Sequence, residues 1–266
     1  MTIKDYVEAI TKRLYSKTSK DHANRILLET LTHDFVKDIE SPKENTANTI
    51  QGLKSGIAKN LALTFLPQHE SEGNVCFANS PELQDAYRTT FTLIDILDYT
   101  YAVLHSPTYR KKHVAFSIIN FSKIPYPKDS EIFWKLVKLG KEIRKLHVLE
   151  SPKIKHDMTN YEVANIGTVK SNHNSIITSI RKNDWEIINE EKQLGIVWIN
   201  DSTYFDNIPA IAWELFIGDS QPAQKWLKNQ KGSNLTPEDI LLYQKIIVAI
   251  IETDKLMKII DKIEID

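Results

Sequence analysis

The chain has 266 residues, of which 41% are apolar and 26% are charged, and its net charge is −1. This composition is typical of a folded globular protein with one large or two ordinary domains. No apolar run approaches the ~20 residues of a membrane span, the N-terminus lacks a signal peptide's apolar segment, and the single cysteine, Cys76, excludes an intrachain disulfide and a cysteine-based zinc cluster. We therefore expect a cytoplasmic protein with no membrane partner.

The small net charge hides a segregation of charge along the chain. Residues 107–156 contain twelve Lys or Arg and four Asp or Glu, a net charge of +8, which leaves −9 for the rest. A basic face on a near-neutral protein can bind phosphates while non-specific affinity stays low. A solvated lysine-rich surface would produce the same pattern.

The first part of the chain is predicted to be helical. Residues 1–40 read as two amphipathic helices, with one apolar stripe at Tyr6, Ile10 and Leu14. Residues 40–49 have the polar composition of a linker. Residues 50–66 predict another helix and residues 81–89 a short one.

A basic turn follows an apolar helix in the middle of the chain. Phe91 to Leu104 predicts the helix, and Ser106 with Pro107 predicts a second, short helix, because Ser is a good N-cap and Pro is tolerated at the first helical position. The chain is then expected to be extended through Phe121 to Tyr126, where prolines exclude a helix. A buried anchor with a cationic edge suits a polyanion binder, and its candidate DNA-binding residues are Arg110, Lys111, Lys112 and Lys123.

A long amphipathic helix is predicted from a cap at Ser130 to about Leu149. Its narrow apolar stripe explains packing, and its lysines fall on roughly the opposite face. These lysines have a function only if DNA lies beside them.

From Ser151 the pattern changes to a small antiparallel sheet with polar loops. The expected strands are Tyr161–Val163, Ile176–Ile180, Trp185–Ile188 and Gly195–Ile199. Asn can pair with adenine, and Arg or Lys with guanine, so polar loop residues are candidate base readers. The candidates are Asn172, Asn174, Arg181 and Lys182. For each of them, a place in an ordinary hairpin turn is the alternative.

The C-terminal part combines an aromatic core with two further helices. An aromatic cluster from Trp198 to Phe216 is expected to be buried. A helical turn at Gln221–Lys231 surrounds Trp226, which is expected to be a buried anchor. Thr236 and Pro237 begin a last helix that is apolar almost all round and therefore buried. The turn's polar members form a second candidate DNA edge: Gln221, Gln224, Lys225, Lys228 and Lys231.

These elements predict an α+β fold: a helical N-terminal part and long helices packed with a small antiparallel sheet, closing with a long buried C-terminal helix.

Catalytic motifs are missing from the sequence. It contains no G-x-x-x-x-G-K-[ST] string for a translocase motor. Asp184, Glu190 and Lys192 weakly imitate a metal-dependent nuclease constellation, a spacing that also arises by chance.

Several long strings resemble one known family. YAVLHSPTYRKK, KIPYPKD and FWKLVKLGKEIRKLHVLESP, followed by GIVWIND, YFDNIPAIAWELFIG, QPAQKWLKNQKG and EDILLYQKIIVAIIETDKLMKIIDKIE, are similar to the C-terminal specificity domain of type ISP restriction–modification enzymes. They occur in the family's order and cover roughly residue 74 to the C-terminus. Related specificity domains form the C-terminal part of adenine-specific DNA methyltransferases that also cut DNA.

The resemblance implies a target-recognition domain at 49–266, after a helical prefix and linker at 1–48 that resembles the start of full-length methyltransferases. The methyltransferase loop Asn/Asp-Pro-Pro-Tyr/Phe is absent, so the chain is a natural remnant, the joined start and end of such an enzyme, or a domain with an ordinary helical prefix. The resemblance also implies that the chain recognises double-stranded DNA. It implies methyltransferase or nuclease domains or subunits as further partners. No cofactor is expected in this chain, since S-adenosylmethionine and Mg²⁺ belong to the catalytic parts. The alternatives are a small metal-dependent DNA-cutting enzyme and a folded remnant that binds nothing.

Overall fold

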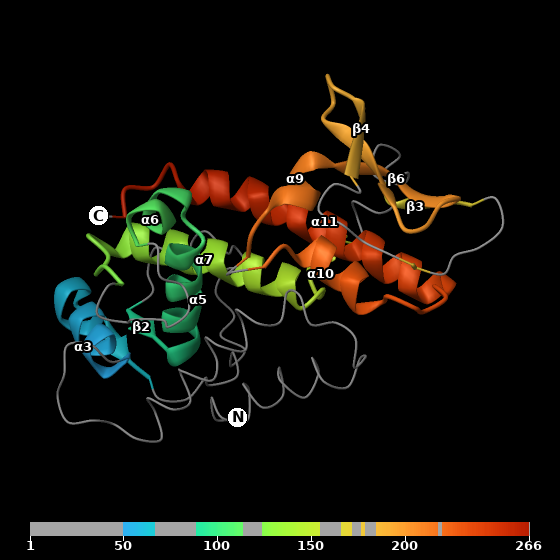
Figure 1. The fold of residues 1–266 in the computed structure, drawn as a ribbon. Coiled ribbons are helices and arrows are strands. Elements are labelled where there is room, and N and C mark those ends of the chain that lie inside the picture. Colours follow the sequence, from blue (N-terminus) through green and yellow to red (C-terminus); the bar gives the residue numbers. More distant parts are fainter. Residues whose placement is uncertain are drawn as a thin grey trace. The chain divides into compact units, whose positions relative to one another are not determined.

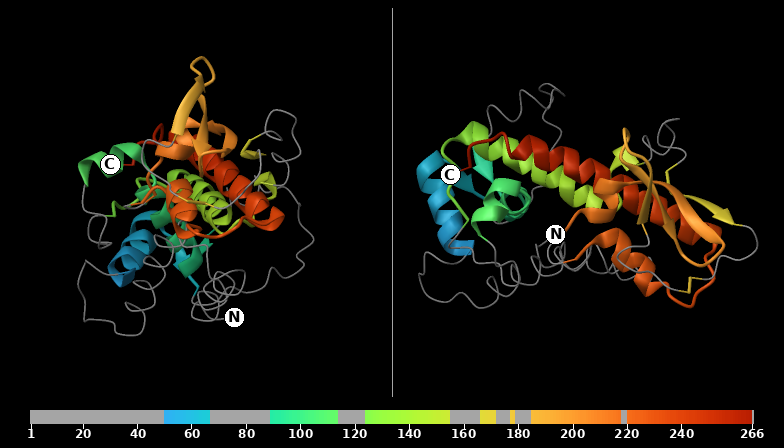
Figure 2. Two further views of the ribbon diagram at one scale, coloured as in Figure 1. Left: turned by 45° about the vertical axis from the view of Figure 1, so that its right-hand side comes forward. Right: turned by 45° about the horizontal axis from the view of Figure 1, so that its top comes forward.

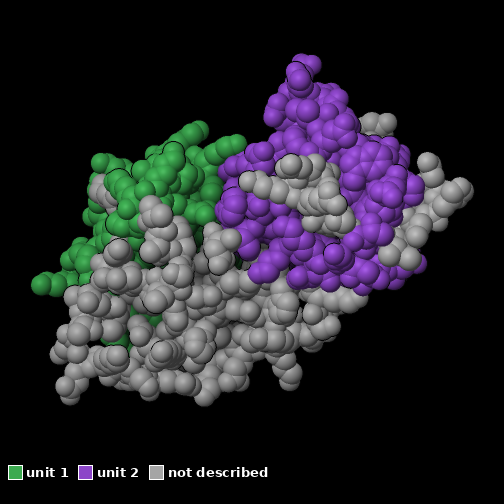
Figure 3. Space-filling model, in the orientation of Figure 1, with its two compact units in different colours: residues 1–13, 29–144, 256–266 green, residues 14–28, 145–255 purple. Residues whose placement is uncertain are grey.

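The computed structural model describes residues 50–66, 89–113, 124–154, 166–171, 177–178, 185–217 and 220–265. The chain divides into two compact units (Figure 3). Unit 1 contains the described residues between 50 and 144 together with 256–265, and unit 2 those between 145 and 255. Helices α7 (Ser130–His147) and α11 (Pro237–Ile260) have residues in both units. Helices and one antiparallel sheet coexist, which confirms the expected α+β class.

Unit 1 is built around helix α5 (Leu93–Leu104; Figure 1). Every residue of this helix from Asp95 to Leu104 is buried. Around it lie α3 (Ile50–Leu61), α6 (Pro107–Lys112) and the first part of α7. Strands β1 (Thr64–Phe65) and β2 (Thr90–Phe91) form a small parallel pair. The sequence predicted the helices of this unit but not the two short strands.

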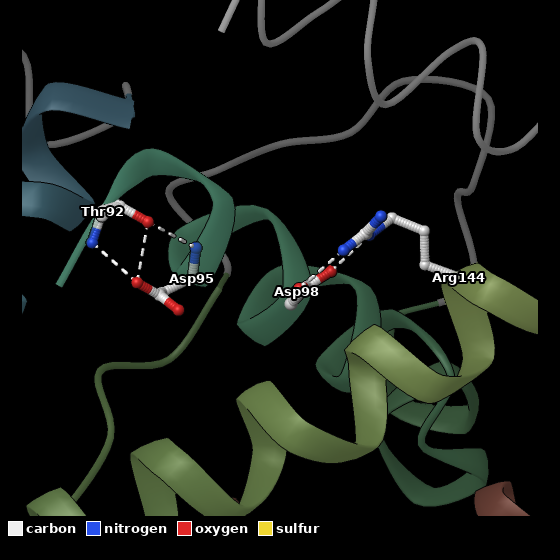
Figure 4. A network of polar contacts seen from close by, with 4 residues as sticks. All are labelled: Thr92, Asp95, Asp98 and Arg144. Atoms are coloured by element: carbon white, nitrogen blue, oxygen red, sulfur yellow. Dashed lines mark hydrogen bonds and ion pairs between the residues drawn. The ribbon is translucent and has the colours of Figure 1, made fainter. Parts of the chain in front are cut away.

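The start of α5 is set by a capping box (Figure 4). The Thr92 hydroxyl accepts a hydrogen bond from the Asp95 backbone N–H at 3.4 Å, and the Asp95 carboxylate accepts from the Thr92 backbone N–H at 2.8 Å. Both groups satisfy donors that a helix start leaves without partners. The helix therefore begins two residues later than the predicted Phe91, which belongs to β2.

Helices α5 and α7 cross with their backbones in close approach at Gly140. A Cβ placed on Gly140 would lie 1.8 Å from the backbone oxygen of Asp98. The Tyr99 hydroxyl donates a 2.8 Å hydrogen bond to the backbone oxygen of Pro125, and the Tyr99 and Phe133 rings lie 5.4 Å apart. The segment Ile124–Pro127 is thereby held against the same core. Of the predicted extended stretch Phe121–Tyr126, residues 124–126 are non-helical as the prolines predicted, and the first three residues lie outside the described residues.

Two further predicted helix boundaries were wrong. The N-cap of α7 is Asp129 rather than Ser130, because the Asp129 carboxylate accepts from the Ile132 backbone N–H at 2.7 Å and Ser130 is already helical. The helix predicted for 50–66 ends at Leu61, because Ala62 adopts a left-handed conformation with φ 52° and the chain then enters β1. Neither event has a Gly or Pro to mark it.

Unit 2 consists of a four-stranded antiparallel sheet packed beside α11 (Figures 1 and 2). The strand order is β3 (Thr168–Ser171), β6 (Thr203–Pro209), β5 (Leu194–Trp198), β4 (Trp185–Asn189), and the hairpin of β4 and β5 projects from the sheet (Figure 1). The rings of Phe205 on β6 and Tyr243 on α11 lie 4.5 Å apart. This core accounts for the apolar first half of α11.

The sequence found only part of the sheet. Strands β4 and β5 are confirmed, whereas Ile177 and Thr178 are not in a strand, and Tyr161–Val163 lies outside the described residues. Strand β6 was predicted only as an aromatic cluster. Its alternation is interrupted by Asn207, whose φ is 54°, where two residues of β6 oppose one residue of β5. Such a bulge breaks the period of two by which strands are recognised.

Unit 2 is completed by α9 (Ala210–Glu214) and α10 (Pro222–Asn229). Trp226 is fully buried and stacks on Tyr243 at 5.1 Å, which confirms it as an anchor. Phe216 was wrongly placed in the core and is 49% exposed, because the chain turns outward where α9 ends at Leu215. The Thr236–Asp239 capping box begins α11 as predicted.

None of the helices among the described residues is long and apolar enough to cross a membrane.

Replacing Gly140 by Ala tests the close crossing of α5 and α7. Although Ala is the better helix former, its Cβ meets a backbone atom that cannot move without moving α5, so we expect a loss of about 1–3 kcal/mol in unfolding free energy. Denaturant unfolding measures it. Lys138→Ala, at an exposed position of the same helix, is the control and should change stability by less than about 0.5 kcal/mol. A Gly140→Ala protein as stable as the control would contradict the crossing.

Candidate nucleic-acid interface

The basic turn of the sequence forms helix α6 in unit 1. The Ser106 hydroxyl caps it by accepting from the Tyr109 backbone N–H at 3.2 Å, and Pro107 occupies the first turn, as predicted. The Tyr109 side chain is buried and lies 4.5 Å from the His113 ring. One short helix thus combines a buried aromatic anchor with three consecutive cations.

The three cations of α6 differ in exposure. Lys111 and Lys112 are exposed, whereas Arg110 is half-buried, and burial lowers the pKa of its guanidinium from its ordinary value. Two exposed lysines therefore lie side by side in sequence on α6. This placement suits contacts to phosphates, which carry charge in all sequences alike.

The C-terminal end of the chain holds the start of α6. The Asp261 carboxylate accepts from the Thr108 backbone N–H at 2.8 Å and from the Ser106 hydroxyl at 3.2 Å. These bonds, the Thr108 backbone bond foremost, hold the pKa of the Asp261 carboxyl below its ordinary value, and the charge of Lys111 acts in the same direction. The sequence analysis missed Asp261, because 153 residues separate it from Thr108 and no local pattern connects them.

His105 lies between the anchor helix and the basic turn. It follows the last residue of α5, and its Nδ1 lies 2.7 Å from the Tyr101 backbone oxygen. Because a carbonyl only accepts, Nδ1 carries the hydrogen. Complete burial lowers the pKa of His105 to about 4, so the ring is neutral at neutral pH.

Arg144 contributes to the positive charge of residues 107–156 but is not available to a ligand. Its guanidinium forms two hydrogen bonds to the Asp98 carboxylate, at 2.6 and 3.0 Å (Figure 4), and the two side chains are only 6% and 1% exposed. Burial raises the pKa of the Asp98 carboxyl, against the influence of Arg144. Lys128 is paired with Glu264 at 3.0 Å. The exposed lysines of α7 in unit 1 are Lys135, Lys138 and Lys141.

The second candidate edge, on α10, divides into structural and exposed residues. Gln224 is buried, and its amide donates to the Trp213 backbone oxygen at 3.0 Å. Gln221 donates to the same oxygen at 3.2 Å. Both amides thus join α10 to the end of α9. Lys225 is half-buried, while Lys228 near the end of α10 and Lys231 in the turn after it are exposed.

The remaining site predictions are not tested by the structure. Lys123, Asn172, Asn174, Arg181 and Lys182 lie outside the described residues.

The nuclease-like constellation receives no structural support. Asp184 lies outside the described residues, and Glu190 and Lys192 are exposed in the turn between β4 and β5. Within the described part of the chain, no three His, Cys, Asp or Glu side chains are grouped so that they could hold a metal ion.

The family of the chain follows from its sequence taken as a whole. The chain matches the type ISP C-terminal specificity domain over residues 15–259, and it therefore belongs to this family. The matched range includes residues 15–48, whose assignment to a separate prefix stays a prediction. Comparison with curated proteins found no match.

Three solved structures resemble this fold in part. They are the ATP-dependent Type ISP restriction-modification enzyme LlaBIII bound to DNA (19% identity, TM-score 0.42), a nuclease-deletion mutant of the Type ISP enzyme LlaGI in complex with a DNA substrate mimic (18%, 0.41), and a DrdV–DNA complex (21%, 0.40). The matches cover 65%, 65% and 70% of this chain. They span 11%, 14% and 19% of the lengths of those proteins.

The buried His105 predicts a pH dependence of stability. The folded-state pKa is about 4 and the unfolded-state value about 6.5, so the unfolded chain binds the additional proton between these values. The free energy of unfolding should therefore fall by about 3 kcal/mol as pH is lowered from about 6.5 to about 4, and this contribution is fully present above pH 6.5.

Urea unfolding of wild type and His105→Gln across this range checks the prediction. In the His105→Gln variant, the unfolding free energy should depend much less on pH over this range than in wild type. His113→Gln, at a half-buried residue directly after α6, is the control and should keep the pH dependence. Equal slopes for wild type and His105→Gln would show that His105 is not the titrating group.

Proposed function

We propose that the chain is the sequence-specific double-stranded DNA recognition domain of a restriction–modification system of the adenine-N6 methyltransferase and endonuclease type. The observation that carries this proposal is the match to the specificity-domain family over residues 15–259. The DNA-bound states named for LlaBIII and LlaGI are consistent with it.

Two groups of residues support DNA binding, and they have different tasks. Four exposed lysines are suited to phosphates: Lys111 and Lys112 on α6, Lys228 on α10, and Lys231 in the turn after α10. Base reading requires polar side chains that enter a groove edge-on, and the candidates for it remain those predicted from the sequence: Asn172, Asn174, Arg181 and Lys182.

Catalysis is assigned to other parts of the enzyme, either further domains or separate subunits. The chain lacks the methyltransferase loop and the translocase motif, so S-adenosylmethionine and Mg²⁺ are expected to bind there and not here. Because the DNA that such a system recognises lies in the cytoplasm, the cytoplasm is its proposed place of action. A small metal-dependent nuclease and a remnant that binds nothing are the competing functions.

DNA titrations at several salt concentrations test the proposal. If four to six phosphates are neutralised, the slope of log affinity against log salt should be about −4 to −5. Absence of binding to duplex DNA at about 50 mM salt would favour the non-binding remnant. Metal-dependent cleavage that is lost in Asp184→Asn would instead favour the nuclease.

Neutralising Lys111 identifies its partner. Lys111→Gln should weaken binding to a preferred and a scrambled duplex equally and make the salt slope shallower by about one, because a phosphate contact carries no sequence information. Lys59→Gln, the same change at an exposed position of α3 in the same unit, is the control. A Lys111→Gln protein that loses affinity for the preferred duplex alone would show that Lys111 reads a base.

A further inference from the structure

We propose that Asp261 is a positioning residue for DNA binding: its carboxylate fixes the start of α6, so that the ammonium groups of Lys111 and Lys112 are held in one place for phosphates. This inference rests on the proposed function. It assigns a role in DNA binding to an acidic residue that itself repels DNA.

Helix α6 needs support from outside itself. It has six residues, fewer than a helix requires to persist on its own. The buried Tyr109 side chain anchors its middle. Its first turn is held by the Ser106 hydroxyl and by Asp261, which takes the backbone N–H of Thr108 and the hydroxyl hydrogen of Ser106 together. Disturbing Asp261 therefore disturbs both caps.

Asp261 is well placed to act as a fixed point. It directly follows α11, and its backbone N–H donates to the Met257 backbone oxygen at 2.9 Å, which adds one more bond to the helical hydrogen-bond series. Met257 and Ile260 beside it are buried. A carboxylate at the end of a 24-residue helix thus reaches α6, 153 residues earlier in the chain.

Because Asp261 is negatively charged, the direction of the change in DNA affinity when it is replaced tests the inference. A carboxylate near Lys111 lowers the positive potential that attracts DNA, so its removal on electrostatic grounds alone strengthens binding. Removal of a positioning contact weakens binding instead. The two explanations predict changes in opposite directions.

Four variants, titrated with a mixed-sequence DNA duplex, separate these explanations. Asp261→Ala should bind up to about fivefold more weakly than wild type, the loss that corresponds to one helix cap. Asp261→Asn keeps an oxygen that accepts from Thr108 but loses the charge, and it should bind at least as tightly as wild type. Ser106→Ala removes the shared hydroxyl with no change of charge and should weaken binding like Asp261→Ala.

The control is Glu264→Gln, which removes an acid of the same C-terminal segment that pairs with Lys128 and does not contact α6 through any described hydrogen bond. It should bind equally or more tightly. Amide hydrogen exchange at Thr108, Tyr109 and Arg110 provides a readout without DNA, and it should be faster in Asp261→Ala and not in Glu264→Gln.

The outcomes distinguish this inference from the proposed function. If wild type binds no DNA, both fail. If wild type binds and Asp261→Ala binds equally or more tightly, the proposed function stands and the positioning role is overturned. Unchanged amide exchange at α6 in Asp261→Ala overturns it as well.

Discussion

The crossing of α5 and α7 at Gly140 is the constraint on which unit 1 depends. The absent side chain lets the α7 backbone approach the Asp98 carbonyl, and one turn further Arg144 meets the Asp98 carboxylate. Both charges are almost completely buried, so a shift of either helix would leave an ion without its partner, at a cost of about 3–5 kcal/mol. Since apolar residues of similar size often stabilise as well as a buried pair, we interpret the Asp98–Arg144 pair as specifying the register of the two helices.

This crossing determines where the basic turn begins. Helix α5 ends at Leu104, and the next two residues, His105 and Ser106, are buried, so the chain leaves the core at one defined point. Helix α6 then starts at a cap shared with Asp261. Helix α6 is thus held at its start by the buried Ser106 and by Asp261, and in its middle by the buried Tyr109.

The sequence predicted the elements whose signals are local. Three helices were marked by side chains within a few residues of one another: by Ser106–Pro107, by Thr236–Pro237 and by the long periodic stretch after Asp129. Each of these helices is present. The family strings were equally informative, since their order along the chain is independent of any fold prediction.

Features that depend on distant residues were not predictable. Strand β6 is hidden by its bulge at Asn207, and the short strands β1 and β2 exist only through each other. In the candidate interface, the cations of α6 were found, but Arg144 was counted with the ligand-facing charge because its partner Asp98 lies 46 residues earlier. Gln224 was assigned to a DNA edge because its amide chemistry suits a base, although burial places that amide on a backbone carbonyl. Burial and long-range pairing decide which polar side chains remain available, and neither is visible in a local pattern.

If the chain recognises a specific DNA sequence, as we propose, it should select that sequence from a library of random DNA duplexes. Selection at several salt concentrations, followed by sequencing of the bound fraction, should give one enriched motif whose advantage over the bulk persists as salt rises, because phosphate contacts weaken for all sequences alike. A bound fraction with no enriched motif, or no bound fraction at low salt, would contradict this proposal.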